Sequence, residues 1–184
     1  MALRGRNSLT EELFFFVTTT IKNFTKVFIE DLFCDILISN IKHYQKRYEF
    51  EIIAYVIMPT HFHWILKIIP SKGTISDIMR DIKKYSAWDI LEKLEEQKSH
   101  LLSNFSSNSL PKQKRQLWQH RFDDKVVRDQ KMLWSTIRYI HNNPVEAGLV
   151  DKPENYKYSS ARNYILNDQS VLYVEKSWAG NLIM

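Results

Sequence analysis

Two apolar runs separated only by Pro59 and Thr60 constrain this chain most strongly. The runs are EFEIIAYVIM over 49–58 and HFHWILKII over 61–69. Both are rich in β-branched and aromatic residues, a composition typical of strands. Proline cannot donate to a sheet ladder, so the break at Pro59 ends the first run as a strand. The pattern therefore predicts a β-hairpin over 49–69.

The rest of the chain alternates between strand-like and helical patterns. The predicted elements are a strand over 13–21, a helix over 25–48 with Thr25 as its cap, a helix over 71–97 capped by Ser or Thr, a loop over 98–116, a strand over 117–129 and a helix over 131–143. We expect the last helix to stop before Pro144, because the residue before a proline avoids helical angles. The order β-α-β-β-α-β-α predicts an α+β fold, a ferredoxin-like antiparallel sheet with packed helices. The predicted organisation is one domain over 10–150 and an irregular, aromatic-rich tail over 151–184.

The charge and the cysteine content narrow the functional classes. The formal net charge is +5, which favours an acidic partner such as nucleic acid over a neutral metabolite. Cys34 is the only cysteine, so the sequence excludes an intramolecular disulfide and a Cys-rich zinc site. No apolar run is long enough to span a membrane, and the N-terminus lacks the apolar core of a signal peptide. We expect a cytoplasmic protein that does not bind membranes.

Two histidines lie one residue apart at the start of the second predicted strand. Residues i and i+2 of a strand point to the same side, so His61 and His63 should project together while Phe62 and Trp64 face the core. Two adjacent neutral imidazoles are a natural start for a divalent-metal site. The pair is equally compatible with two partly exposed histidines near a turn, and the motif alone does not decide between these interpretations.

A second polar pair lies on the predicted helix over 131–143. Tyr139 and Asn143 are four residues apart and therefore share a helical face. The asparagine offers an amide oxygen that suits Mg²⁺ or Mn²⁺, and the tyrosine offers a phenol that can act as a nucleophile. A tyrosine and a capping asparagine at the end of a surface helix would give the same pattern.

Basic and aromatic residues interleave in two places. This pattern suits single-stranded nucleic acid, since cations follow phosphates and rings stack on bases. A solvated helix face and a charged, partly buried strand would give the same composition. The candidate DNA-binding residues are Lys83, Lys84, Lys112, Lys114, Arg115, Trp118, Arg121 and Arg128.

Four segments occur in an order that resembles a known family. They are YVIMPTHFHWIL, LWQHRFDDKVVRD, RYIHNNPVEAGLV and PENYKYSS. Together they resemble the REP-associated tyrosine transposases, members of the HUH superfamily of single-strand-cutting nucleases and close to the IS200-like transposases. The resemblance runs from about residue 13 to about residue 163. It departs from the family at Thr60, where asparagine is frequent, a change expected to affect only the turn.

The resemblance implies roles for the candidate residues. By it, His61, His63 and Asn143 hold a divalent ion, Mg²⁺ or Mn²⁺, and Tyr139 is the nucleophile that forms a 5′-phosphotyrosine. The implied substrate is single-stranded DNA with a hairpin or inverted-repeat structure, and the implied assembly is a monomer or a homodimer. Tyr85, flanked by Lys83 and Lys84, remains the alternative nucleophile.

Two other functions stay open from the sequence. A non-catalytic single-stranded nucleic-acid-binding module could use the same sheet and the same exposed aromatics. A simple metallohydrolase could use His61 and His63 alone and would cleave DNA without a covalent adduct.

Overall fold

A four-stranded antiparallel sheet forms the centre of the molecule. The structure is a computed structural model and describes residues 13–106 and 115–179. The strands are β1 (Phe14–Thr20), β2 (Glu51–Met58), β3 (His61–Lys67) and β4 (Asp123–Val126). They lie in the order β2-β3-β1-β4, and each neighbouring pair is antiparallel. This is the ferredoxin-like arrangement, and it confirms the predicted α+β fold and the predicted hairpin.

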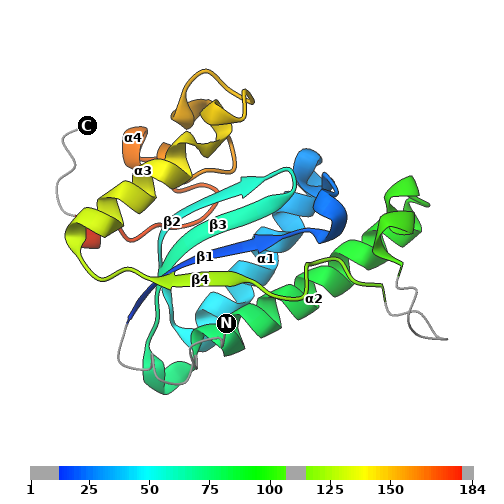
Figure 1. Ribbon diagram of the computed structural model, residues 1–184, viewed down its shortest axis with the longest axis horizontal. Helices are drawn as coiled ribbons and strands as arrows, with labels where there is room; N and C mark the ends of the chain where they lie inside the picture. The colour runs from blue at the N-terminus through cyan, green and yellow to red at the C-terminus, as the bar shows by residue number, and fades with distance from the viewer. Residues whose placement is uncertain (1–12, 107–114, 180–184) are drawn as a thin grey trace, which may run out of the picture.

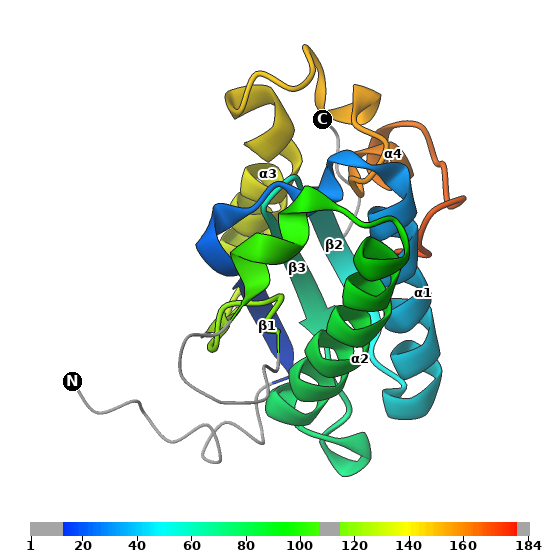
Figure 2. The same cartoon turned by 90° about the vertical axis from the view of Figure 1, so that its right-hand side faces the viewer.

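Helices cover both faces of the sheet (Figure 1). Helices α1 (Asp31–Tyr48) and α2 (Ile75–Glu96) pack together on one face, and α3 (Gln130–Glu146) crosses the other. Figure 2 shows the sheet between these two layers. The strands alternate, so each face has its own core: Phe62 and Trp64 belong to the cluster under α1 and α2, and Ile65 belongs to the cluster under α3. Over residues 13–106 and 115–179, no helix has the length and apolar character needed to cross a bilayer.

The helix predicted over 25–48 begins later than expected, at Asp31. The preceding residues 22–29 form short 3-10 turns, and Asn23 and Phe24 adopt positive φ values of 56° and 52°. Thr25 does not cap the helix, because its hydroxyl donates to the Lys22 carbonyl instead. The cap of α2 was predicted correctly: Thr74 forms a capping box with Asp77.

Three more element boundaries differ from the prediction. The strand predicted over 117–129 is reduced to β4, with one separate bridge between Ile21 and Trp118. Helix α3 does not stop before Pro144 but continues to Glu146. Pro144 cannot donate to the carbonyl four residues earlier, yet its ring is buried. The helix ends at Glu146, less than one turn later, and Gly148 follows with a positive φ of 67°. Part of the predicted loop, His100–Phe105, is a 3-10 helix.

The segment after α3 packs along the outer edge of β2. Its backbone exchanges hydrogen bonds with β2, from Ile57 N to the Tyr158 carbonyl and from Ser160 N to the Tyr55 carbonyl. The Ser160 hydroxyl also accepts from Tyr55 N and bonds the buried ring of His141 in α3. The short helix α4 (Ala161–Ile165) follows. This segment therefore covers an edge that would otherwise be open to another strand.

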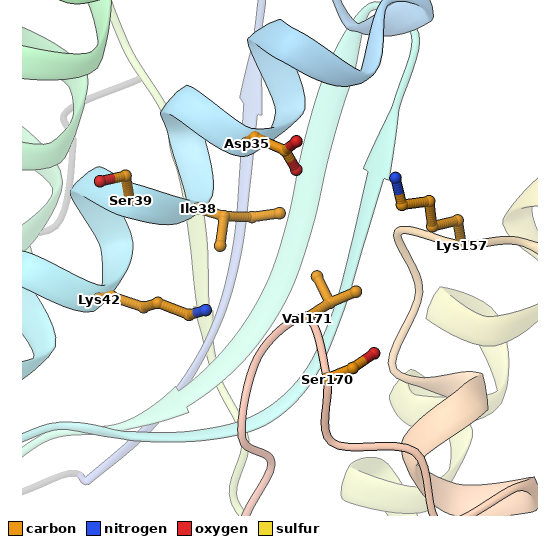
Figure 3. A pocket seen from close by; sticks show the side chains of 7 residues that line it. All are labelled: Asp35, Ile38, Ser39, Lys42, Lys157, Ser170 and Val171. Atoms are coloured by element: carbon orange, nitrogen blue, oxygen red, sulfur yellow. The ribbon is translucent and has the colours of Figure 1, made fainter.

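The same segment also contacts α1. A pocket of about 440 Å³ lies between them. In Figure 3, Lys157 and Val171 face Asp35 and Ile38. Lys157 forms an ion pair with Asp31 at the start of α1. The pocket contains none of the residues predicted to form a functional site.

Candidate active site

The two histidines project from β3 toward α3, on the face opposite Phe62 and Trp64. Their ring centroids are 4.6 Å apart. The Nδ1 atom of His63 lies 2.7 Å from the Thr18 hydroxyl on the neighbouring strand β1. The Nδ1 atom of His61 lies 2.9 Å from the Thr60 hydroxyl in the hairpin turn. Each ring is thus fixed through one nitrogen, which leaves the Nε2 atoms as the candidate metal ligands.

Burial keeps both imidazoles neutral near neutral pH. Desolvation, together with the neighbouring His61, lowers the pKa of His63 to about 3. Desolvation also lowers the pKa of His61, and a hydrogen bond with the Asn143 side chain partly opposes this shift. The contact between each Nδ1 and a threonine hydroxyl allows either tautomer, and in the tautomer whose Nδ1–H donates, the lone pair lies on Nε2. This is the form that binds a metal ion.

Helix α3 brings Tyr139 and Asn143 to the histidines. The Tyr139 ring centroid is 5.4 Å from that of His63 and 6.0 Å from that of Phe16, which itself stacks on His63 at 5.7 Å. The Tyr139 side chain is 45% exposed, so its phenol is open to a substrate. Asn143 lies one helical turn on and donates through Nδ2 to the Tyr139 carbonyl. Asn143 lies inside the helix, so the expectation that it ends α3 is wrong.

The donor set fits a divalent ion. Two imidazole rings on β3 and the Asn143 amide on α3 lie together, and they would form a mixed set of nitrogen and oxygen ligands that Mn²⁺ accepts and that Mg²⁺ accepts together with water and phosphate oxygens. In the part of the chain that the structure describes, no cluster of three His, Cys, Asp or Glu side chains could hold a metal. The candidate ligands His61, His63 and Asn143 are neutral, so they would leave the charge of a bound ion available to a negatively charged substrate.

The contact between Thr18 and His63 makes a testable prediction. We expect Thr18→Val to weaken Mn²⁺ binding by about 10- to 100-fold, because the hydroxyl orients the ligand ring. Isothermal calorimetry with Mn²⁺ measures this affinity. Thr19→Val is the matched control, since Thr19 faces the opposite side and its buried hydroxyl has no partner among the described residues. Equal Mn²⁺ affinities for the two variants would contradict the assigned role of Thr18.

The alternative nucleophile, Tyr85, lies elsewhere. It is on α2, where its ring packs near Tyr44 and Trp88 at centroid distances of 5.6 and 6.4 Å. Helix α2 covers the face of the sheet opposite the histidines. The sheet therefore separates Tyr85 from the histidine pair, whereas Tyr139 contacts it.

Some of the candidate DNA-binding residues share a groove of about 630 Å³ between α2 and residues 115–122. Lys83, Lys84, Arg115 and Trp118 line it. Lys83 donates to the Gln119 carbonyl, and Arg115 forms an ion pair with Glu95.

Trp118 lines the groove but is buried, and Arg121 and Arg128 lie outside the groove. Trp118 is only 3% exposed and packs near Phe28, so its ring is a core residue and we do not propose it for stacking on bases. Arg121 and Arg128 are exposed but do not line the groove. Lys112 and Lys114 lie outside the described residues.

Two residues of the site were missed from the sequence. Thr60 was expected to affect only the turn, but its hydroxyl contacts the adjacent His61. Thr18 lies 45 positions before His63 and meets it only through the register of β1 with β3, in which the two residues are directly paired. A serine or threonine on the strand next to a His-x-His motif is the signal that a sequence search could use.

Comparisons with known proteins show the family and the fold. Residues 12–143 match the family model described as "Transposase IS200 like". A Haemophilus influenzae protein described as "Putative REP-associated tyrosine transposase" is 24% identical over 176 residues, which cover 96% of this chain and 93% of that protein. The solved structure of a REP-associated tyrosine transposase bound to a REP hairpin superposes with a TM-score of 0.63 at 19% identity. The match covers 94% of this chain and 90% of that one.

Proposed function

The chain belongs to the IS200-like transposase family, whose members act on DNA, and on this premise we propose that it cuts and rejoins single-stranded DNA through a phosphotyrosine intermediate. The observation that carries the proposal is the contact between the exposed Tyr139 and His63. A nucleophile beside a pair of side chains that can bind a metal is one arrangement suited to phosphodiester transfer.

Tyr139 is the nucleophile of the proposed reaction. Its phenol oxygen attacks the scissile phosphorus, a Tyr–O–P bond forms, and the bond to the 3′ oxygen breaks. The phenol gives up its proton and the leaving 3′ oxygen gains one. The products are a 5′-phosphotyrosine and a free 3′-hydroxyl. The covalent bond retains the energy of the phosphodiester, so a second 3′-hydroxyl can reverse the step without ATP.

His61, His63 and Asn143 would hold the divalent ion, Mg²⁺ or Mn²⁺. When bound, such an ion supplies Lewis acidity for the phosphate and helps to orient it. The chain's own contribution is to keep the ligands neutral through burial and fixed through Thr18 and Thr60. Phe16 stacks on His63 and closes one side of the site.

The proposed substrate is single-stranded DNA folded into a hairpin. The related solved protein is bound to a REP hairpin, and the net charge of +5 suits a polyanion. The exposed and groove-lining cations Lys83, Lys84, Arg115, Arg121 and Arg128 remain candidates for backbone contacts.

The test is a covalent-adduct gel. The protein is incubated with Mn²⁺ and labelled hairpins copied from inverted repeats beside its own coding region, then denatured. We expect label to migrate with the protein and to disappear when a chelator is added first. Cleavage products without any protein-linked label would instead identify a metallohydrolase.

We further propose that one chain supplies the whole active site. Tyr139 and the histidines meet within a single chain, and the outer edge of β2 is covered by residues 156–160 of that chain. A mixture of Tyr139→Phe and His63→Ala proteins should therefore form no adduct, measured on the same gel. Recovery of the adduct in the mixture would show that the tyrosine and the histidines come from different subunits.

A further inference from the structure

Phe24 is an aromatic residue held in the solvent by a strained backbone. Its side chain is 67% exposed, the most exposed of the large hydrophobic residues in the described part of the chain. Its φ is 52°, and that of Asn23 is 56°. Positive φ is unusual for a bulky side chain, and residues held in this region tend to cluster at functional sites. An exposed phenylalanine contributes little to a core, so stability alone does not explain this conformation.

Hydrogen bonds on several sides impose the conformation. Lys22 N donates to the Leu117 carbonyl at 2.7 Å, and Phe24 N donates to the Ile21 carbonyl at 3.1 Å. The Asn23 side chain donates to the Asn104 carbonyl at 3.0 Å. The turn is thus tied to two other segments of the fold, which hold the ring at a defined place outside the core.

This place is next to the strand that carries the histidines. Thr20 pairs with His61 in the sheet, and Ile21 N donates to the Thr60 carbonyl at 2.8 Å. Phe24 follows one turn later, within about 7 Å of Ile21 between Cα atoms. Figures 1 and 2 show the segment between β1 and α1 lying across the end of the sheet, beside the β2–β3 turn. The Phe24 segment therefore lies at the end of the sheet where β3 begins with His61, so a strand that runs from the histidine pair past this end would reach it.

We propose that Phe24 stacks on an unpaired base of the substrate strand beside the scissile phosphate and so positions the cleavage site. This inference rests on the proposed function. An unpaired base offers a flat π face, and an exposed aromatic ring is the side chain that binds such faces without sequence readout. Lys26, two residues on, is exposed and cationic, as a neighbouring phosphate requires, and Ile29, 65% exposed, adds apolar surface. Phe24 would be a positioning residue and would not take part in the bond changes.

The test compares a hairpin that carries a short unpaired flank at the cleavage side with the same hairpin without it. We expect Phe24→Asn to weaken binding of the flanked hairpin by about 5- to 100-fold, the range for one lost base–aromatic stack, and to leave the bare hairpin unaffected. Asparagine tolerates positive φ, so the melting temperature should be unchanged or higher. Replacing a residue that only supports the fold would lower the melting temperature, so weaker DNA binding at an unchanged or higher melting temperature indicates a direct role of Phe24 in binding. Phe24→Trp should restore the affinity.

Trp88→Ala is the matched control, because Trp88 is equally exposed, at 65%, but lies on α2. Equal affinities of wild type and Phe24→Asn for the flanked hairpin would overturn the inference, and so would a wild type that does not prefer the flank. The covalent-adduct gel distinguishes a failure of the inference about Phe24 from a failure of the proposed function. If wild type and Phe24→Asn form equal amounts of adduct, only the proposed role of Phe24 is excluded. If the wild type binds the flanked hairpin selectively but forms no adduct, the phosphotyrosine mechanism is excluded.

Discussion

Replacing Tyr139 by phenylalanine should abolish the covalent protein–DNA adduct and reduce cleavage by at least about a thousand-fold. The substitution removes only the phenol oxygen, which is the atom that forms the bond to phosphorus. The side chain is 45% exposed, so the free energy of unfolding should change by no more than about 0.5 kcal/mol. Hairpin affinity should also be unchanged, because the ring still contacts His63 and Phe16. Adduct yield on a denaturing gel and hairpin binding by fluorescence anisotropy measure the two effects separately.

The matched control is Tyr85→Phe, which removes the same atom from a ring on the other side of the sheet. It should cleave and form adduct as the wild type does. If Tyr85→Phe loses the adduct while Tyr139→Phe still forms it, the phosphotyrosine reaction would stand, but the nucleophile would be Tyr85 and the site assigned here would be wrong. Wild-type behaviour of both variants would favour the non-catalytic binding module.

Removing the histidine pair should abolish the response to divalent metal. We expect Mn²⁺ to raise the melting temperature of the wild type in a concentration-dependent way and to have no effect on His61→Ala/His63→Ala. Adduct formation by this variant should fall by at least about a hundred-fold, since the phosphate then has no Lewis acid. Differential scanning fluorimetry across a Mn²⁺ titration gives the first result, and the adduct gel gives the second.

His100→Ala controls for the general loss of an imidazole, because His100 is exposed and lies in the 3-10 helix after α2. It should keep the full Mn²⁺ response. A double histidine variant that still binds Mn²⁺ and still forms adduct would show that the metal is held elsewhere.

Periodicity was sufficient to predict the sheet and the helices because each face of the sheet has its own core. The alternation in HFHWILKII placed Phe62 and Trp64 in one core and both histidines on the other face, as the structure confirms. The failures occurred where tertiary contacts override local preference. Pro144 continues α3 for a turn with its ring buried, and the backbone of 22–24 is bent by bonds to residues far along the chain.

The site likewise depends on tertiary contacts that local sequence patterns do not predict. A helical step of four residues places Tyr139 and Asn143 on one face, and a strand step of two places the histidines together, so both pairs followed from spacing. Their convergence did not, because it depends on how α3 crosses the sheet. The contact between Thr18 and His63 depends on the register of two strands separated by a helix and a strand. Register of that kind has no local sequence signal.

If Tyr139 becomes covalently linked to DNA, mass spectrometry of the protease-digested adduct will locate the linkage. We expect a fragment that contains Tyr139 and carries a 5′-phosphorylated nucleotide on the phenol oxygen. A nucleotide linked to Tyr85 or to any other side chain would contradict this assignment. Cleaved DNA with a free 5′-phosphate, and no linked fragment at any reaction time, would contradict the phosphotyrosine mechanism itself.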